Sequence, residues 1–191
     1  VCLVCGFDYS FGKGAEGKPE TLRDFFLPQS IGVEIVDEIK DGFGKIGTTR
    51  IKGLLSEGKA EQAAVLLGES YRMEGVVMHG YGVGNSRLGF PTANLSVPKE
   101  KHPLKSGVYA GRAKVDDKVF RAIINMGCRP TFDDDEIKAE AFLLDFDGNL
   151  YGKKITLFFD SFLRETKKFD NADCLKAQLE ADRKEAIRRI K

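Results

Sequence analysis

The sequence lacks three features that would point to common classes of protein. It has no excess of charge, since 30 Lys and Arg face 29 Asp and Glu and the net charge is +1. This balance disfavours a nucleic-acid binder that acts through overall positive charge, although a local basic patch would be compatible with a net charge near zero. No apolar run approaches the roughly 20 residues that cross a bilayer, and no basic and apolar leader opens the chain. We therefore expect a cytoplasmic protein without membrane or nucleic-acid partners.

Histidine and cysteine are too few and too scattered for a structural zinc site. The chain holds two histidines and four cysteines. Cys2 and Cys5 form a CxxC pair, whereas Cys128 and Cys174 stand alone. A structural zinc site usually takes four ligands from two such pairs. We expect Cys2 and Cys5 to be small residues of a buried strand.

The remaining composition is that of a globular protein with two kinds of pattern. Apolar residues make up 42% of the 191 residues, which is enough to bury a core. The pattern changes near residue 70, and we divide the chain into residues 1–70 and 71–191. The chain opens in the β-favouring run 1–5 without a methionine, so we expect the natural protein to be longer.

The first part mixes helical and extended patterns. Apolar and polar residues alternate over 31–39, as in a strand. Thr48 or Thr49 is suited to cap a helix that runs to about Leu55. Residues 57–67 have apolar residues at helical spacing, and Gly68 is placed to end that helix.

From Tyr71 onward short strands dominate. Short turn sequences, Asp116-Asp117 and Asp147-Gly148, each separate two of these strands and predict hairpins. Strands at this spacing predict a small antiparallel barrel or sandwich. The predicted strands are 73–78, 107–115, 118–126, 138–146 and 153–159.

A helix is expected at the end of the chain. Asp170 is a candidate for its N-cap. Apolar residues then recur on one face of this helix: Leu175, Leu179, Ala186 and Ile190.

The glycine-rich run 80–94 is the most specific stretch of the sequence. Gly80, Gly82 and Gly84 alternate after a strand, and such loops can offer backbone N–H groups to phosphate oxygens. No Gly-Lys-Ser/Thr follows, so this is not a Walker A loop, and a flexible hairpin remains an alternative. Thr92 and Asn94 follow one residue apart. On an extended segment they point the same way and could hold Mg²⁺ beside a nucleotide.

Glu140 is the candidate acid–base residue. Its predicted strand places it on one face with three large apolar side chains, Phe142, Leu144 and Phe146. Desolvation would disfavour the carboxylate form and make Glu140 a better proton acceptor. The alternatives are a strand-end carboxylate that reaches water and an ion pair with a Lys or Arg.

These motifs resemble those of the riboflavin kinases. Gly-Phe-Pro-Thr-Ala-Asn at 89–94 is similar to the family signature, and further matches follow in family order up to the C-terminus. The first 70 residues resemble the end of the FMN adenylyltransferase module that bacteria fuse to this kinase. Two segments carry this resemblance: residues 6–12, which include Phe7 and Asp8, and residues 48–52, which include Thr49 and Arg50. The other matching segments of the kinase part are 106–109, 125–132, Glu140, 150–152 and 162–165, continuing to Asp182.

The resemblance implies both a fold and an activity. The fold would be mostly β, a six-stranded antiparallel Greek-key barrel with a C-terminal helix, preceded by a partial α/β nucleotidyltransferase module. The activity would be transfer of the ATP γ-phosphoryl to the ribityl 5'-hydroxyl of riboflavin, giving FMN and ADP. A full-length form would also convert FMN to FAD.

The resemblance also implies residue roles. Glu140 would accept the hydroxyl proton, and Thr92 and Asn94 would bind the nucleotide and position its Mg²⁺. Arg164 and Leu175 would contact the isoalloxazine ring, although an ion pair of Arg164 with Glu165 or Asp170 is the alternative. ATP phosphates would lie on the glycine loop, formed by Gly80, Gly82, Gly84 and Arg87.

The sequence departs from the family pattern at several positions. Val83 stands where a basic residue is common, and Phe142 stands where bacterial members often have His. Gly47-Thr48 replaces two serines of the phosphate segment. The Phe-Asp-Gly-x-His-x-Gly-His type segment that engages ATP in adenylyl transfer is absent, so we expect these 191 residues to make FMN but not FAD.

Two other classes of function compete with the kinase. A non-catalytic flavin-binding module would need no combination of Thr92, Asn94 and Glu140. A small barrel that binds single-stranded nucleic acid is disfavoured by the charge balance and by the lack of a basic stripe among aromatics. The sequence does not indicate an oligomeric state.

Overall fold

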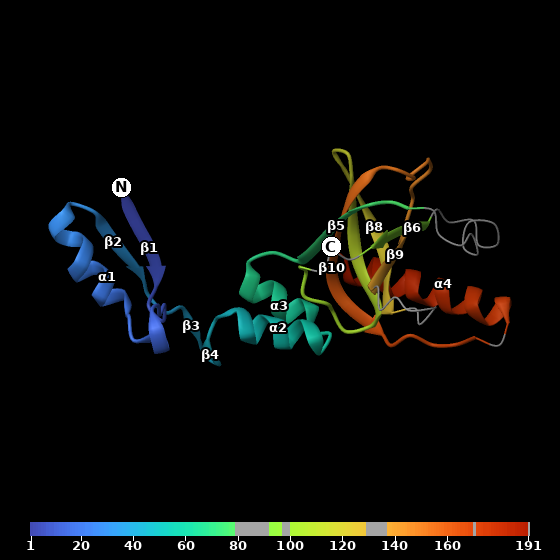
Figure 1. Ribbon diagram of the computed structural model, residues 1–191. Helices are drawn as coiled ribbons and strands as arrows, with labels where there is room; N and C mark the ends of the chain where they lie inside the picture. Colours follow the sequence, from blue (N-terminus) through green and yellow to red (C-terminus); the bar gives the residue numbers. More distant parts are fainter. Residues whose placement is uncertain (79–91, 97–99, 129–136, 170, 191) are drawn as a thin grey trace. The chain divides into compact units, whose positions relative to one another are not determined.

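The computed structural model describes residues 1–78, 92–96, 100–128, 137–169 and 171–190 (Figure 1). The chain forms two compact units, Val1–Arg50 and Ile51–Lys191. The division falls inside helix α2 (Thr48–Ser56), about twenty residues before the change of pattern in the sequence. Helix α3 (Ala60–Leu67) contacts strands of the second unit and therefore belongs to it. No helix among the described residues is both long and apolar enough to span a membrane.

The first unit is built around two parallel strands. β1 (Cys2–Gly6) pairs with β2 (Gly32–Val36), and helix α1 (Pro19–Phe26) forms the crossover that a parallel pair requires. Cys2 is exposed and Cys5 is half-buried. The prediction of a buried strand here is wrong, because β1 has a single neighbouring strand within this unit. The remaining elements are the 3-10 turns η1 (Lys13–Ala15) and η2 (Leu27–Gln29) and the hairpin strands β3 (Lys40–Asp41) and β4 (Gly44–Lys45).

The second unit is the predicted six-stranded antiparallel barrel. Its strands lie in the order β5-β10-β7-β8-β9-β6. The two outer strands meet where the Met78 N–H donates to the Asn94 carbonyl at 2.9 Å, which closes the sheet. The strands are β5 (Tyr71–Val76), β6 (Thr92–Ser96), β7 (Gly107–Val115), β8 (Lys118–Cys128), β9 (Ile137–Leu143) and β10 (Lys154–Arg164).

One of the two predicted hairpins is confirmed and the other is wrong. β7 and β8 pair across the Asp116-Asp117 turn, in which Asp116 has φ 53°. β9 and β10 are not neighbours in the sheet, so Asp147-Gly148 is no hairpin turn. The segment between them is fixed elsewhere, because the Leu144 N–H donates to the Arg121 carbonyl at 2.7 Å and Leu150 is buried. This crossing connection gives the sheet its Greek-key order.

The barrel interior is closely packed and apolar. Tyr109 and Phe159 are fully buried, and their rings meet edge to face with centroids 5.5 Å apart. The Tyr109 hydroxyl donates to the Lys105 carbonyl at 2.7 Å, which satisfies its buried polar end. At Gly111 strands β7 and β10 approach so closely that a Cβ would clash with the Phe158 carbonyl oxygen. Leu55, Ala60 and Ala63 of α2 and α3 complete this core.

Helix α4 (Ala172–Arg189) covers part of the outer face of the barrel. Its N-cap is Asn171, whose Oδ1 accepts the Cys174 N–H at 2.9 Å. The predicted cap, Asp170, lies outside the described residues, and the cap falls one residue later because Asn171 has the extended backbone (φ −152°) of a cap. The apolar cluster under this helix contains Val108, Ala110, Ile123, Leu144, Ala186 and Ile190.

Candidate active site

Three neighbouring strands place a row of polar side chains on the outer face of the barrel. Glu140 of β9 lies opposite Asn94 of β6 on one side and opposite Asn125 of β8 on the other. Opposed residues of antiparallel strands have Cα atoms about 4.5–5.5 Å apart and point to the same face. Their neighbours Ala93 and Ala139 are fully buried in the barrel core. The row of Asn94, Glu140 and Asn125 therefore faces outward.

Thr92 extends this group along β6. It lies opposite Phe142, two residues from Asn94, and is buried. Since side chains alternate along a strand, Thr92 and Asn94 share the outer face, as predicted. The two side-chain oxygens are hard ligands of the kind that Mg²⁺ takes together with water and phosphate. Among the described residues no cluster of three or more His, Cys, Asp or Glu could hold a metal by itself.

The surroundings of Glu140 match the sequence prediction in part. Phe142 and Leu144 lie on the same outer face and pack in the cluster under α4. Phe146 does not belong to this face, because its side chain packs against the core cluster of the barrel interior. Its ring instead meets Phe120 edge to face at 5.1 Å.

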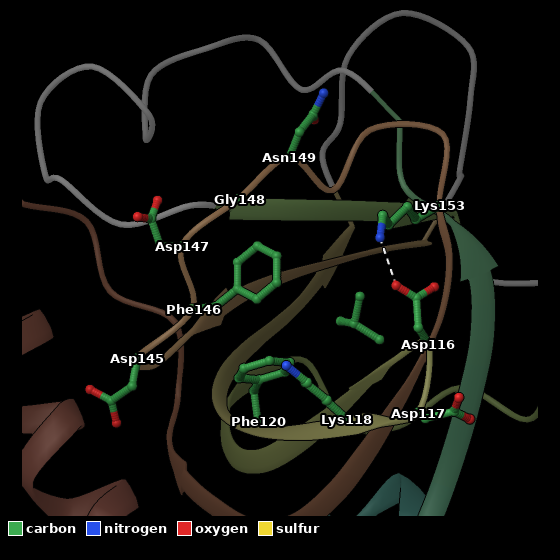
Figure 2. A pocket seen from close by; sticks show the side chains of 11 residues that line it. Asp116, Asp117, Lys118, Phe120, Asp145, Phe146, Asp147, Gly148, Asn149 and Lys153 are labelled. Atoms are coloured by element: carbon green, nitrogen blue, oxygen red, sulfur yellow. Dashed lines mark hydrogen bonds and ion pairs between the residues drawn. The ribbon is translucent and has the colours of Figure 1, made fainter.

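A pocket of about 550 Å³ opens between the β7–β8 turn and the segment after β9 (Figure 2). Phe120 and Phe146 form its apolar wall, and Lys153 reaches across to Asp116 at 2.6 Å. The volume is within the range of sites that hold small ligands and cofactors. The lining residues are Val115, Asp116, Asp117, Lys118, Phe120, Asp145, Phe146, Asp147, Gly148, Asn149 and Lys153.

Backbone hydrogen bonds connect one residue of the pocket lining, Lys153, to the strand that carries Asn94. The Val77 N–H donates to the carbonyl of the lining residue Lys153, and the next N–H, that of Met78, donates to the Asn94 carbonyl, each at 2.9 Å. Two strand spacings thus separate Lys153 from Asn94, which is roughly 10 Å.

Four of the predicted nucleotide ligands lie outside the described residues. These are Gly80, Gly82, Gly84 and Arg87, and Val83 lies with them.

Arg164 is engaged by helix α4. Its Nε and Nη2 donate to the two carboxylate oxygens of Asp182 at 2.9 and 2.7 Å, and Asp182 is 4% exposed. Gln178 donates to the same carboxylate at 2.8 Å. The alternative ion pair with Glu165 is not formed, because Glu165 binds Lys105 and gives Arg164 only its backbone carbonyl. Arg164 thus ties β10 to α4, and Leu175 lies half-buried near the start of that helix.

Sequence reasoning missed Asn125 as an individual site residue. Asn125 stood within the matched run 125–132, but the register of β8 against β9 was needed to place it beside Glu140. The partner of Arg164 had a clearer signal, since Gln178 and Asp182 are spaced i, i+4 on one helix face.

Comparison with known proteins places the second part of the chain in one family. The model of the flavokinase family, described as riboflavin kinase, matches residues 67–190. The chain belongs to the riboflavin kinase family. Its β barrel, α4 and the row around Glu140 all fall within the matched residues.

Curated relatives in this family are bifunctional. Bifunctional riboflavin kinase/FMN adenylyltransferases from Listeria monocytogenes and Bacillus subtilis are 37% and 35% identical over 181 and 188 residues, or 94% and 97% of this chain. The Escherichia coli K12 protein is 33% identical over 187 residues. The chain spans 57%, 59% and 57% of the lengths of these three relatives.

One solved structure shares the fold over nearly the whole chain. It is described as a macrolide-efflux protein from Streptococcus pneumoniae, is 33% identical and has a TM-score of 0.85. The likeness covers 97% of this chain and 60% of that one.

The residues likened to the adenylyltransferase meet at the β3–β4 hairpin of the first unit. Lys45 forms an ion pair with Asp8 and lies 4.6 Å from the centre of the Phe7 ring. Arg50 binds both carboxylate oxygens of Asp41 at 2.8 Å, which holds the pKa of that carboxyl below its usual range. The structure therefore gathers Phe7, Asp8 and Arg50 at one hairpin. Thr49 precedes Arg50 in the first turn of α2.

Proposed function

We propose that residues 71–191 form a riboflavin kinase domain that transfers the γ-phosphoryl of ATP to the ribityl 5'-hydroxyl of riboflavin. The products are FMN and ADP. The observation that carries this proposal is the placing of Glu140 directly opposite Asn94 in a chain of the riboflavin kinase family.

Glu140 acts as the general base of this reaction. The 5'-hydroxyl oxygen forms a bond to the γ-phosphorus while the bond from that phosphorus to the β,γ-bridging oxygen breaks. The hydroxyl proton passes to the Glu140 carboxylate. A base positioned in this way contributes on the order of 10²–10⁴-fold in rate.

Thr92 and Asn94 bind the nucleotide together with its Mg²⁺, which neutralises charge on the phosphates. Their oxygens share one face, next to the hydroxyl acceptor Glu140. The pocket takes the base of ATP, against Phe120 and Phe146. The family resemblance adds the glycine loop, formed by Gly80, Gly82, Gly84 and Arg87.

The flavin ring is placed near Arg164 and Leu175. Because Asp182 holds the guanidinium at its edge, Arg164 can offer a fixed planar face to the ring. A protein that consumes ATP in this way is expected in the cytoplasm, with ATP, riboflavin and FMN as its ligands and without nucleic-acid or membrane partners.

The second activity named for the relatives, FMN adenylylation, concerns the first part of the chain. We propose that residues 1–70 derive from an FMN adenylyltransferase module, in which Phe7 and Asp8 belong to the flavin-side loop and Thr49 and Arg50 to the phosphate segment. FAD formation requires the ATP-engaging segment that these 191 residues lack. The chain alone is expected to give FMN without FAD.

Chromatographic separation of riboflavin, FMN and FAD after incubation with ATP and Mg²⁺ tests the proposal. Glu140→Gln is expected to lower the rate of FMN formation by roughly 10²–10⁴-fold. Glu74→Gln is the matched control, because Glu74 is an exposed residue of β5 that pairs with Lys154 at 2.9 Å, and its rate should stay within twofold, or about 0.4 kcal/mol.

Two results would contradict the proposal. A less than threefold loss on Glu140→Gln would remove Glu140 from the role of base. Quenching of flavin fluorescence without any FMN formation would favour the alternative, a non-catalytic flavin-binding module.

A further inference from the structure

Asn125 carries a buried polar atom that the fold leaves without a partner. Its Oδ1 is inaccessible to solvent and accepts no hydrogen bond within the described part of the chain. Buried polar atoms are nearly always hydrogen-bonded, so an exception in a well-packed strand calls for an explanation. Strand β8 around it is regular, with Ile124 and Met126 fully buried on the opposite face.

The position of Asn125 in the sheet suggests what its partner is. It lies between Glu140 of β9 and Val108 of β7. Val108 belongs to the apolar cluster under α4, and the next residue in the row, on β10, is Arg164. Along this row the outer face therefore runs from Arg164 and Val108 beside α4, through the amide of Asn125, to Glu140 and Asn94.

This order matches the order of groups in riboflavin. The molecule has a flat aromatic ring system, then a chain of hydroxyl groups, then the terminal hydroxyl that receives the phosphoryl group. A polyol hydroxyl can donate to the Oδ1 of an amide and can also accept from its Nδ2. We propose that Asn125 is a substrate-binding residue that hydrogen-bonds the ribityl chain and directs its terminal hydroxyl toward Glu140. This inference rests on the proposed function.

Ser161 provides a comparison within the same barrel. Its Oγ is also buried without a partner among the described residues. Ser161 lies opposite Ala110, which α4 covers, and it sits at a bulge of β10 rather than beside Glu140. Ser161 thus has a buried atom without a partner among the described residues but does not lie beside Glu140. It is therefore a matched control for Asn125.

A comparison of the affinities for two flavins shows whether Asn125 binds the ribityl chain or has only a structural role. Riboflavin and lumiflavin, which has the ring without the ribityl chain, are titrated by flavin fluorescence in the presence of Mg²⁺ and ADP. Asn125→Leu is expected to weaken riboflavin binding about tenfold, the scale of one hydrogen bond whose partner group is left buried. Lumiflavin affinity should stay within about twofold. Ser161→Ala should leave both affinities within the same limit.

Thermal unfolding of the same variants gives the readout that a structural role predicts. Replacing Asn125, whose Oδ1 is buried without a partner among the described residues, by a leucine of similar size should leave the melting temperature unchanged or raise it. A loss of riboflavin affinity at unchanged or higher stability therefore supports the binding role. If Asn125→Leu does not fold, Asn125→Ser, which keeps a hydroxyl at the position, is tested in the same way and should weaken riboflavin binding selectively.

Two outcomes would overturn the inference. One is an unchanged riboflavin affinity in a folded Asn125 variant, and the other is an equal loss for riboflavin and lumiflavin. Absence of FMN formation by the unsubstituted protein would instead overturn the kinase proposal, while the two-flavin comparison would still decide the role of Asn125.

Discussion

The two units of the chain bury their side chains to very different degrees. In the barrel unit, large residues such as Tyr109, Phe159 and Leu157 are fully buried. In residues 1–50, all of which the structure describes, Pro19 is the only buried residue. Phe43 there is 91% exposed.

The amino-acid types do not explain this difference, because both units contain large apolar residues. The arrangement of strands does. The barrel joins its outer strands at Met78 and Asn94 and therefore encloses an interior. A parallel pair such as β1 and β2 is normally buried on both faces, and two strands with one crossover helix cannot provide that cover. Within these residues the barrel encloses its own interior, whereas β1, β2 and α1 do not.

Hydrogen exchange on the whole chain should show the largest difference between the units. Amides of β7, β8 and β10 are expected to exchange through global unfolding, which costs about 5–15 kcal/mol in ordinary domains. Amides of β1 and β2 should open locally at much lower cost. A difference of at least roughly 10³-fold in protection is expected, which corresponds to about 4 kcal/mol.

The amides of the Asp116-Asp117 turn serve as an internal reference in the exchange experiment. They should exchange fast whether or not the two units differ in stability. Equal protection of β1 and β8 would show that residues 1–50 are as stable as the barrel, and would contradict the comparison.

The same contrast explains which parts of the fold were predictable from the sequence. Local signals sufficed where neighbours in sequence are neighbours in space, as at the β7–β8 hairpin and at Gly68, which ends α3 with φ 76°. They failed at Asp147-Gly148, where a good turn sequence joins strands that are not paired. Strand order there depends on contacts distant in sequence, such as that of Leu144 with Arg121.

The candidate site divides in the same way. Thr92 and Asn94 were predictable as a pair because strand alternation alone puts them on one face. Their meeting with Glu140 followed only from the family resemblance, since the register of β6 against β9 is a non-local property. Asn125 was not singled out, because an isolated asparagine in a strand gives no local signal of its role.

Truncation of one phenylalanine in each unit sharpens the comparison. Phe159→Ala removes a fully buried ring and should lower the free energy of unfolding by about 3–5 kcal/mol. Phe25→Ala removes a ring that is 63% exposed and should change it by no more than about 0.5 kcal/mol. Urea unfolding followed by circular dichroism measures both. Losses of similar size would mean that Phe25 is covered in solution.

The smallest expected effect is a difference in pH dependence between the units. In the barrel unit, hydrogen bonds from Arg188 and Arg189 lower the pKa of the Glu185 carboxyl to about 2, from an ordinary value of 4.5. In the first unit, a hydrogen bond from Lys45 lowers the pKa of Asp8. A carboxyl whose pKa is lower in the folded protein contributes stability above its unfolded pKa, and loses it as the pH falls toward the folded value.

Glu185→Gln should therefore lower the melting temperature slightly at pH 6, and the difference from the unsubstituted protein should shrink as the pH falls from about 4.5 toward 2. Asp8→Asn should leave the melting temperature of the barrel unchanged at every pH, because the first unit opens separately. Melting curves between pH 6 and pH 3 measure both. An effect of Asp8→Asn as large as that of Glu185→Gln would show that the two units unfold together, since only then does a charge in residues 1–50 act on the transition of the barrel.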